Sequence, residues 1–126
     1  MVKLDHLSLP VSDWRRSSDW YVVHFGFRLE FEVPRGGRAG LGVAALQDDA
    51  GLTLFFEQVD GPVRSGQAAY TLQVDDVDRL YERLSGDGIA FDAAPAKQFW
   101  GYGAELRDPD GHRLYLYDEQ SMQEKG

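Results

Sequence analysis

Apolar and polar side chains alternate along residues 4–11 with a period of two, which is typical of a strand whose two faces meet different surroundings. Between residues 14 and 25 the apolar positions recur at helical spacing and predict a helix with one apolar stripe. Ser12 or Asp13 supplies the N-cap of this helix, and Gly26 supplies a left-handed C-terminal cap. Further strands are predicted over residues 27–33, 41–47 and 52–59.

The same order of elements returns after a linker at residues 60–66. A strand over residues 69–74 leads into a helix that Asp75 or Asp76 caps and that residues 86–88 end. The apolar side chains of this helix, spaced as i, i+3, i+4 and i+7, are Val77, Leu80, Tyr81 and Leu84. Three more strands are predicted near residues 89–93, 103–107 and 113–118.

Two short motifs recur in both halves of the chain. Residues 48–56 (DDAGLTLFF) return as residues 108–116 (DPDGHRLYL), shifted by 60 positions. Residues 11–13 (VSD) return as residues 74–76 (VDD), shifted by 63 positions. The halves therefore follow one plan, β-α-β-β-β.

The repeat predicts a single α+β domain over residues 1–126, with module one at residues 3–60 and module two at residues 67–119. A sheet that one helix covers leaves its other face bare, and two such sheets can bury that surface together. We therefore expect a curled eight-stranded mixed sheet around a cleft. The strand face that does not touch the helices lines the cleft, and this face includes His6, Tyr115 and Tyr117.

Composition narrows the functions that are open to this chain. It has no cysteine, which excludes disulfides, thiol nucleophiles and cysteine-ligated zinc. With 21 acidic against 13 basic residues, its net charge of −8 opposes nucleic acid and anionic membranes and favours a cationic or neutral small ligand. No apolar signal region or bilayer-spanning run is found, so a cytoplasmic protein is expected. The polar tail at residues 120–126 is expected to fray.

Three features are candidates for ligand contacts, and each also has a structural explanation. His6 either orients a ligand or acts as a base, or it is satisfied by a neighbouring hydroxyl or carbonyl. Glu57 either pairs with a ligand cation or is a strand-end carboxylate in solvent. The aromatic stretch at residues 99–103, with Trp100 and Tyr102, either walls a cleft or belongs to a core or dimer contact. The glycine-rich residues 34–40 read as a hairpin turn, because no helix follows them.

Three motifs occur in order within this duplication: Asp5-His6-Leu7, Val74-Asp75-Asp76-Val77-Asp78 and Asp108-Pro109-Asp110-Gly111. Together they resemble the vicinal oxygen chelate superfamily, the glyoxalase, bleomycin-resistance and extradiol dioxygenase group. The resemblance extends from Leu4 to Glu119. It implies a divalent metal in the cleft, held by one ligand from the first strand and one from the fourth strand of each half.

The repeat maps those ligand positions onto His6, Phe55, Ala69 and Tyr115, where enzymes of the group carry Glu at the last position. Alanine and phenylalanine have no donor atom, and a phenol with a pKa near 10 is a poor ligand at neutral pH. At least three protein ligands are needed, so we expect neither a metal nor another cofactor. Glu57 lies two residues beyond Phe55, and a register slip would bring it to the metal position.

The sequence is thus interpreted as a metal-free binder of a small aromatic or cationic organic molecule, similar to the antibiotic-binding branch that sequesters drugs. Phe55, Trp100 and Tyr115 are expected to stack on the ligand, while His6, Glu57 and Tyr102 anchor its polar groups. By analogy with such folds, and from the aromatic residues Trp14, Trp20 and Trp100, we expect a homodimer.

Two other functions stay open. One is an enzyme: a divalent-metal lyase, isomerase or dioxygenase of the glyoxalase type with shifted ligands, or a metal-free isomerase that uses His6 or Glu57 as base. The other is a partner-binding or regulatory domain, whose cleft is closed by its own aromatic side chains.

Overall fold

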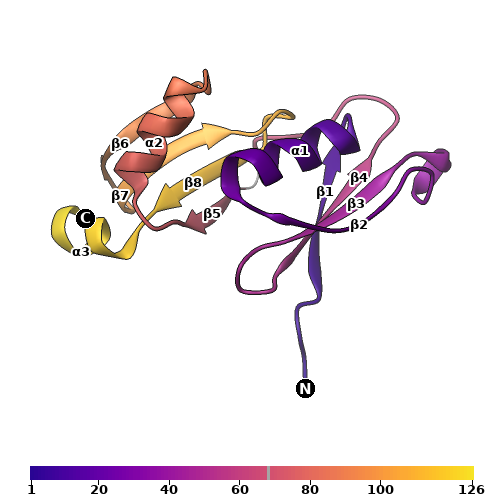
Figure 1. The fold of residues 1–126 in the computed structure, drawn as a ribbon, viewed down its shortest axis with the longest axis horizontal. Coiled ribbons are helices and arrows are strands. Elements are labelled where there is room, and N and C mark those ends of the chain that lie inside the picture. The colour runs from indigo at the N-terminus through magenta and orange to yellow at the C-terminus, as the bar shows by residue number, and fades with distance from the viewer. Residues whose placement is uncertain (68) are drawn as a thin grey trace. The chain divides into compact units, whose positions relative to one another are not determined.

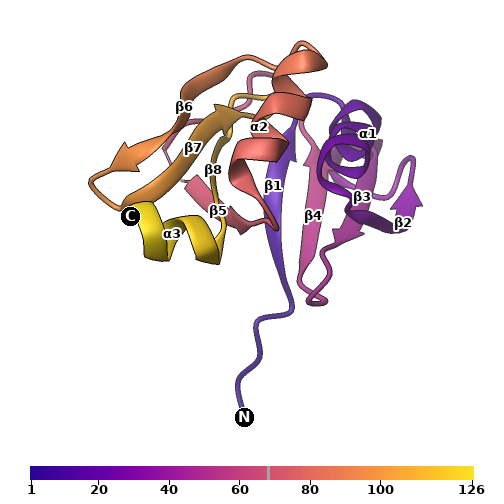
Figure 2. The same ribbon diagram turned by 60° about the vertical axis from the view of Figure 1, so that its left-hand side comes forward.

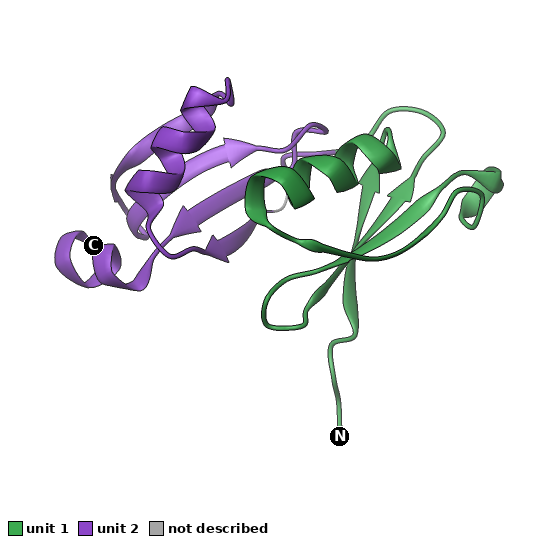
Figure 3. Ribbon diagram, in the orientation of Figure 1, with its two compact units in different colours: residues 1–64 green, residues 65–126 purple. Residues whose placement is uncertain are grey.

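The computed structural model describes residues 1–67 and 69–126 of the chain. Within these residues, eight strands form two four-stranded sheets, and the chain divides into two compact units, Met1–Arg64 and Ser65–Gly126 (Figures 1 and 3). Each unit has the order β-α-β-β-β, so the predicted α+β class and the two βαβββ modules are confirmed. The two units are called module one and module two below.

Module one consists of a mixed sheet and the helix that covers it. Its elements are β1 (His6–Val11), α1 (Trp14–Phe25), β2 (Arg28–Val33), the 3-10 turn η1 (Arg38–Gly40), β3 (Val43–Gln47) and β4 (Thr53–Gln58). The strands lie in the order β1-β4-β3-β2, with β1 parallel to β4 and the other neighbours antiparallel. Figure 2 shows these strands side by side with α1 lying over them.

Helix α1 begins and ends at the residues that its sequence predicts. The Asp13 side chain accepts hydrogen bonds of 3.1 Å from the amides of Arg15 and Arg16, and Gly26 ends the helix at φ 71°. Between these caps the buried Tyr21 packs on Phe56 of β4, with ring centroids 5.1 Å apart. Burial of these two rings holds the helix on one face of the sheet.

Module two repeats this arrangement and adds a helix. Its elements are β5 (Ala69–Gln73), α2 (Val77–Gly86), β6 (Phe91–Gln98), β7 (Gly101–Arg107), β8 (Arg113–Tyr117) and α3 (Glu119–Lys125). The strands lie in the order β5-β8-β7-β6, and Asp76 caps α2 through a 3.0 Å bond from the amide of Arg79. Strand β6 runs further than predicted, through Pro95, because an edge strand can do without one ladder donor.

The expectation of a frayed tail was wrong, because residues 119–125 form α3. Asp118 starts this helix: its carboxylate accepts bonds from the amide and the hydroxyl of Ser121, at 2.6 and 3.0 Å. The same carboxylate accepts a 2.7 Å bond from the amide of Val77, the first residue of α2. One buried aspartate therefore satisfies the first turns of two helices.

Among the helices of residues 1–67 and 69–126, none has both the length and the apolar character that crossing a bilayer requires.

We predict that Asp118→Ala lowers the free energy of unfolding by about 2 kcal/mol at neutral pH, because two helix starts lose their acceptor. Burial alone would raise the pKa of Asp118, but the bonds from Val77 and Ser121 outweigh it and hold that pKa below its ordinary 3.8. A lowered pKa means that the stabilisation is complete above pH 3.8 and is lost as the pH falls through the lower folded value. Urea titrations between pH 2 and 7 should show that the difference in unfolding free energy between the wild-type protein and the variant becomes smaller in acid.

Asp75→Ala is the matched control, since Asp75 is an exposed aspartate beside the start of α2. Its effect should stay within about 0.5 kcal/mol. Equal effects of the two variants at pH 7 would contradict the double role of Asp118.

Candidate functional site

The uncovered face of the sheet in module one carries the candidate site. Side chains alternate along β4, so Phe56 packs under α1 while Phe55 and Glu57 point to the other face. The parallel pairing places His6 opposite Thr53, Ser8 opposite Phe55 and Pro10 opposite Glu57. We call this surface the open face of module one; it comprises His6, Ser8, Pro10, Phe31, Val33, Val43, Ala45, Thr53, Phe55 and Glu57.

An aromatic patch lies at the centre of the open face. The ring of Phe55 is 5.5 Å from that of His6 and 6.2 Å from that of Phe31, both at tilted angles. These are ordinary distances for aromatic pairs, and 45% of Phe31 remains exposed. Phe31 was missed in the sequence, although its pairing beside Ala45 follows once β2 is placed next to β3.

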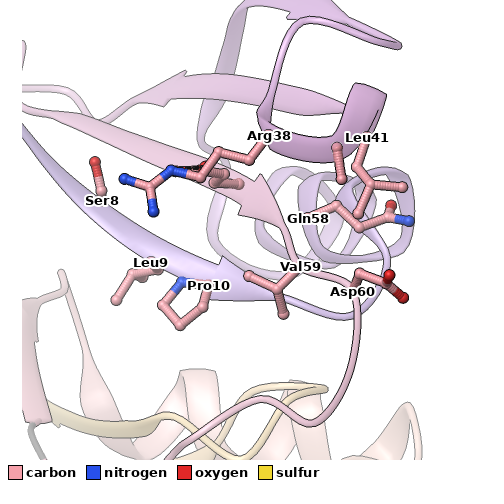
Figure 4. A pocket seen from close by; sticks show the side chains of 10 residues that line it. Ser8, Leu9, Pro10, Arg38, Leu41, Gln58, Val59 and Asp60 are labelled. Carbon is pink, nitrogen blue, oxygen red and sulfur yellow. Dashed lines mark ion pairs between the residues drawn. The ribbon is translucent and has the colours of Figure 1, made fainter.

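Two hollows flank the aromatic patch, both formed within module one. The hollow near His6, of about 320 Å³, also has Glu30, Gln47 and Thr53 in its lining. The second hollow, of about 370 Å³, lies toward the C-terminal ends of β1 and β4 (Figure 4). Its lining includes Ser8, Pro10, Arg38, Leu41, Glu57, Val59 and Asp60. The open face therefore offers an aromatic surface with polar groups on either side.

His6 makes its polar contact with the preceding residue. Its Nδ1 lies 3.0 Å from the Oδ2 of Asp5. This hydrogen bond, followed by the charge of His6, lowers the pKa of Asp5 below its ordinary value. An ionised Asp5 accepts the bond, so a neutral His6 donates from Nδ1 and keeps Nε2 as an acceptor. His6 can thus accept a hydrogen bond from a ligand.

The residues of this face do not fit the metal that the resemblance implies. The β1–β4 pairing runs without a shift from His6–Thr53 to Val11–Gln58, so the register slip that would rescue the ligand set is not present. Glu57 stands four residues further along the strand than the position opposite His6, about 13 Å at 3.3 Å per residue. Ligand atoms that share one metal ion each lie about 2 Å from the ion, so His6 and Glu57 are too far apart along the sheet to bind the same ion.

Donor chemistry points the same way. Phe55 stands at one of the four family positions and has no donor atom, and Tyr115 offers a phenol at the position where the resemblance implies a glutamate. Within the described parts of the chain, no group of three or more histidine, cysteine, aspartate or glutamate side chains could hold a metal ion.

The uncovered face of the sheet in module two carries a second aromatic pair. Trp100 stacks on Tyr115 with ring centroids 5.5 Å apart and planes at 22°. The indole lies over Gly103, where a Cβ would come within 2.3 Å of it. The predicted proximity of Trp100 and Tyr115 is therefore present, and Gly103 leaves room for it.

Tyr102 is not brought together with Trp100 and Tyr115. It projects from β7 to the side of α2, where its hydroxyl donates a 2.8 Å bond to Asp78. This bond is the main cause that raises the pKa of Tyr102 above its ordinary value. The ammonium of Lys125 lies 4.9 Å from the centre of the Tyr102 ring and 3.1 Å from Asp78. Tyr102 thus ties α3 to α2 instead of anchoring a ligand beside the Trp100 stack.

Comparisons with known proteins agree with the resemblance found in the sequence. The model of the family described as "Glyoxalase/Bleomycin resistance protein/Dioxygenase superfamily" matches residues 3–116. Among solved structures, TnmS3, an antibiotic binding protein from Streptomyces sp. CB03234, is 29% identical, covers 94% of this chain and 96% of its own, and gives a TM-score of 0.75.

Two further structures support the fold alone, because their identity is low. A glyoxylase/bleomycin resistance protein/dioxygenase domain from Frankia sp. EAN1pec is 24% identical, with 92% of this chain and 96% of that chain covered and a TM-score of 0.73. TioX from Micromonospora sp. ML1 is 24% identical, with 91% and 97% covered and a TM-score of 0.67. None of the curated proteins that were compared matches the chain.

We predict that Gly103→Ala lowers the free energy of unfolding by about 2 kcal/mol or more, because the new methyl group meets both the Trp100 ring and the carbonyl oxygen of Leu116. The displaced indole should also change the near-ultraviolet circular dichroism. Gly86→Ala is the matched control, since a Cβ there meets nothing within 4 Å. It should leave stability equal or raise it by about 0.5–1 kcal/mol. A neutral Gly103→Ala with an unchanged spectrum would contradict the packing of Trp100 over Gly103.

Proposed function

Because the chain belongs to the glyoxalase/bleomycin resistance protein/dioxygenase superfamily, we propose that it binds a small aromatic or cationic organic molecule and sequesters it, as an antibiotic-binding protein does. The observation that carries this proposal is the aromatic patch of Phe55, His6 and Phe31 on the open face of module one. Such a patch offers stacking area and one hydrogen-bond acceptor at the same place.

The charges around the patch favour a cationic or neutral ligand. The described lining of the hollow near His6 includes one lysine, Lys3, and two carboxylates, Asp5 and Glu30. The whole chain carries a net charge of −8, which raises the local concentration of cations and repels anions.

The second aromatic pair has a part in this proposal. Trp100 and Tyr115 form a flat stack on the uncovered face of module two, and we propose that this stack, like Phe55 on module one, offers stacking area to an aromatic ligand. His6 and Glu57 supply the polar anchors. Tyr102 has no place in this set, because its hydroxyl is bound to Asp78.

One neighbour supports the proposal beyond the fold. TnmS3 is an antibiotic binding protein, and it is similar to this chain over nearly the whole length of both. A binding function also agrees with the misfit of the metal positions, since sequestration needs a complementary surface and no reactive centre.

The proposal predicts that planar aromatic antibiotics quench the tryptophan fluorescence of this protein and raise its melting temperature. Phe55→Ala should weaken binding of the best of them about tenfold, because a stacking partner is lost. Val23→Ala, at an exposed site on α1, is the control and should leave the affinity unchanged. No quenching and no change of melting temperature across a panel of basic and neutral compounds would refute the proposed function.

We also propose a homodimer. Apolar side chains stay exposed on both sides of the edge strand β2, with Leu29 on the side of α1 and Phe31 and Val33 on the open face, each more than 40% accessible, and such an edge is typical of an interface. Light scattering should give twice the chain mass of 14.2 kDa, and Leu29→Glu should shift the mass toward the single chain by placing a charge on this edge strand. A mass of one chain at all concentrations would show that β2 is not such an interface.

A further inference from the structure

Glu57 has an internal cation as its neighbour. The Nε of Arg38 lies 3.5 Å from the Oε1 of Glu57. The two side chains differ in exposure: 93% of the arginine is accessible to solvent, against 29% of the glutamate. Figure 4 shows the arginine extending from η1 over the hollow. A carboxylate that belongs to the sheet is therefore covered by a cation that reaches in from solvent.

The loop that presents Arg38 is closed by hydrogen bonds of its own and lies close to Val43 of β3. The amide of Gly37 donates a 2.8 Å bond to the carbonyl of Leu41, and the amide of Leu41 donates a 3.1 Å bond to the carbonyl of Arg38. A Cβ on Gly37 would lie 2.9 Å from a methyl group of Val43, so only glycine fits there. The loop thus fixes the backbone from which the arginine extends.

The residue after Arg38 has an unfavourable backbone conformation. Ala39 has φ 57° and ψ 21°, and it is the non-glycine residue with positive φ among the described residues. A left-handed conformation is unfavourable for alanine, and such strain is common where a loop serves a ligand site. The strain is kept directly beside the side chain that covers Glu57.

The contact between Arg38 and Glu57 is weak enough to be replaced. Its shortest nitrogen–oxygen distance, 3.5 Å, exceeds the roughly 2.7–2.9 Å of a charge-assisted hydrogen bond. Ion pairs with a solvent-exposed partner contribute little to stability. A ligand ammonium in contact with Glu57 would make a shorter bond in a less solvated place.

Phe55 and Glu57 together define a spacing. They lie two residues apart on the same face of β4, about 6.6 Å at 3.3 Å per residue. The intervening surface is apolar on the side of Pro10 and Val43, which pair with Glu57 on either strand. A ring on Phe55 and a cation on Glu57 can therefore belong to one small molecule.

We propose that Glu57 binds the basic nitrogen of the ligand, and that Arg38 occupies this carboxylate until the ligand replaces it. The inference rests on the proposed function, because the ring of the same ligand stacks on Phe55. It adds the ligand class: a planar aromatic molecule with a basic amine about 7 Å from the ring. It also makes Arg38 a specificity-determining residue, because the ligand cation has to displace a like charge.

Competition between Arg38 and a ligand amine for Glu57 changes the affinity for the amine in a predictable direction. The apparent affinity for an amine is reduced by the fraction of protein in which Arg38 covers Glu57. Loss of the guanidinium therefore strengthens the binding of a cationic ligand and leaves that of a neutral analogue unchanged. Loss of the Glu57 charge has the opposite effect on the amine alone.

The test uses two probes that share the dansyl ring and the linker, dansyl-ethylenediamine, which carries an ammonium, and its N-acetyl derivative, which carries a neutral amide there, followed by dansyl fluorescence at low salt. We expect the wild-type protein to prefer the free amine. Arg38→Gln should bind the amine about fivefold more tightly, with the acetylated probe unchanged. Glu57→Gln should bind both probes with the affinity that the wild-type protein has for the acetylated one.

Arg35→Gln is the matched control, since it removes an exposed arginine from the same loop and tests for a general charge effect. Circular dichroism of each variant checks its fold. An unchanged or weaker affinity of Arg38→Gln for the amine overturns the inference, as does an equal gain in Arg35→Gln. If the wild-type protein and all variants bind both probes equally, the aromatic site stands and the cation site fails. If no protein binds either probe, the proposed function fails and this inference fails with it.

Discussion

The packing of Tyr21 on Phe56 determines which face of the sheet in module one is covered by α1 and which face stays open. Once the ring of Phe56 is buried under α1, the strand period of two turns Phe55 and Glu57 to the opposite face. The parallel partner strand β1 then adds His6, Ser8 and Pro10 to that face through its fixed register. The aromatic patch, both hollows and the cover over Glu57 all follow from this one helix–sheet contact.

The same register explains why the described residues of the open face do not fit the metal ligand set that the resemblance implies. A shift of one residue would turn Glu57 away to the helix side, and a shift of two would bring it to the place of Phe55. The pairing allows neither, because Leu54 and Phe56 must stay buried opposite Leu7 and Leu9. Core packing thus fixes the chemistry of the open face, which is aromatic and acidic.

Much of this fold could be predicted from the sequence, because its signals are local. The caps at Asp13 and Gly26 involve residues close to them in the chain, and the helical periodicity can be read directly along each helix. Because the chain repeats, an element that is predicted in one half is also expected in the other half. What could not be predicted depends on contacts between distant residues. Asp118 caps α3 locally, through Ser121, but no apolar stripe marks a helix in this polar tail, and the bond from the amide of Val77 to the same carboxylate joins residues 41 positions apart.

The site was predictable to the same extent. His6, Phe55 and Glu57 follow from alternation and the repeat, and they do share one face. Phe31 and Arg38 enter only through the placement of β2 and η1 beside that face, which no motif marks. Tyr102 is separated from Trp100 because Trp100 lies in the turn before β7, where strand alternation does not apply, and stacks on Tyr115, whereas Tyr102 lies in the strand and bonds to Asp78.

Ligand binding on the open face is tested most directly by nuclear magnetic resonance, with the amides and methyl groups of module one followed during titration with a planar aromatic amine. Shifts should centre on His6, Phe55 and Glu57, and the buried helix side at Tyr21 and Phe56 should change little. Shifts confined to the outer surface of α1, or no shifts at a saturating concentration, would contradict a ligand site on this face.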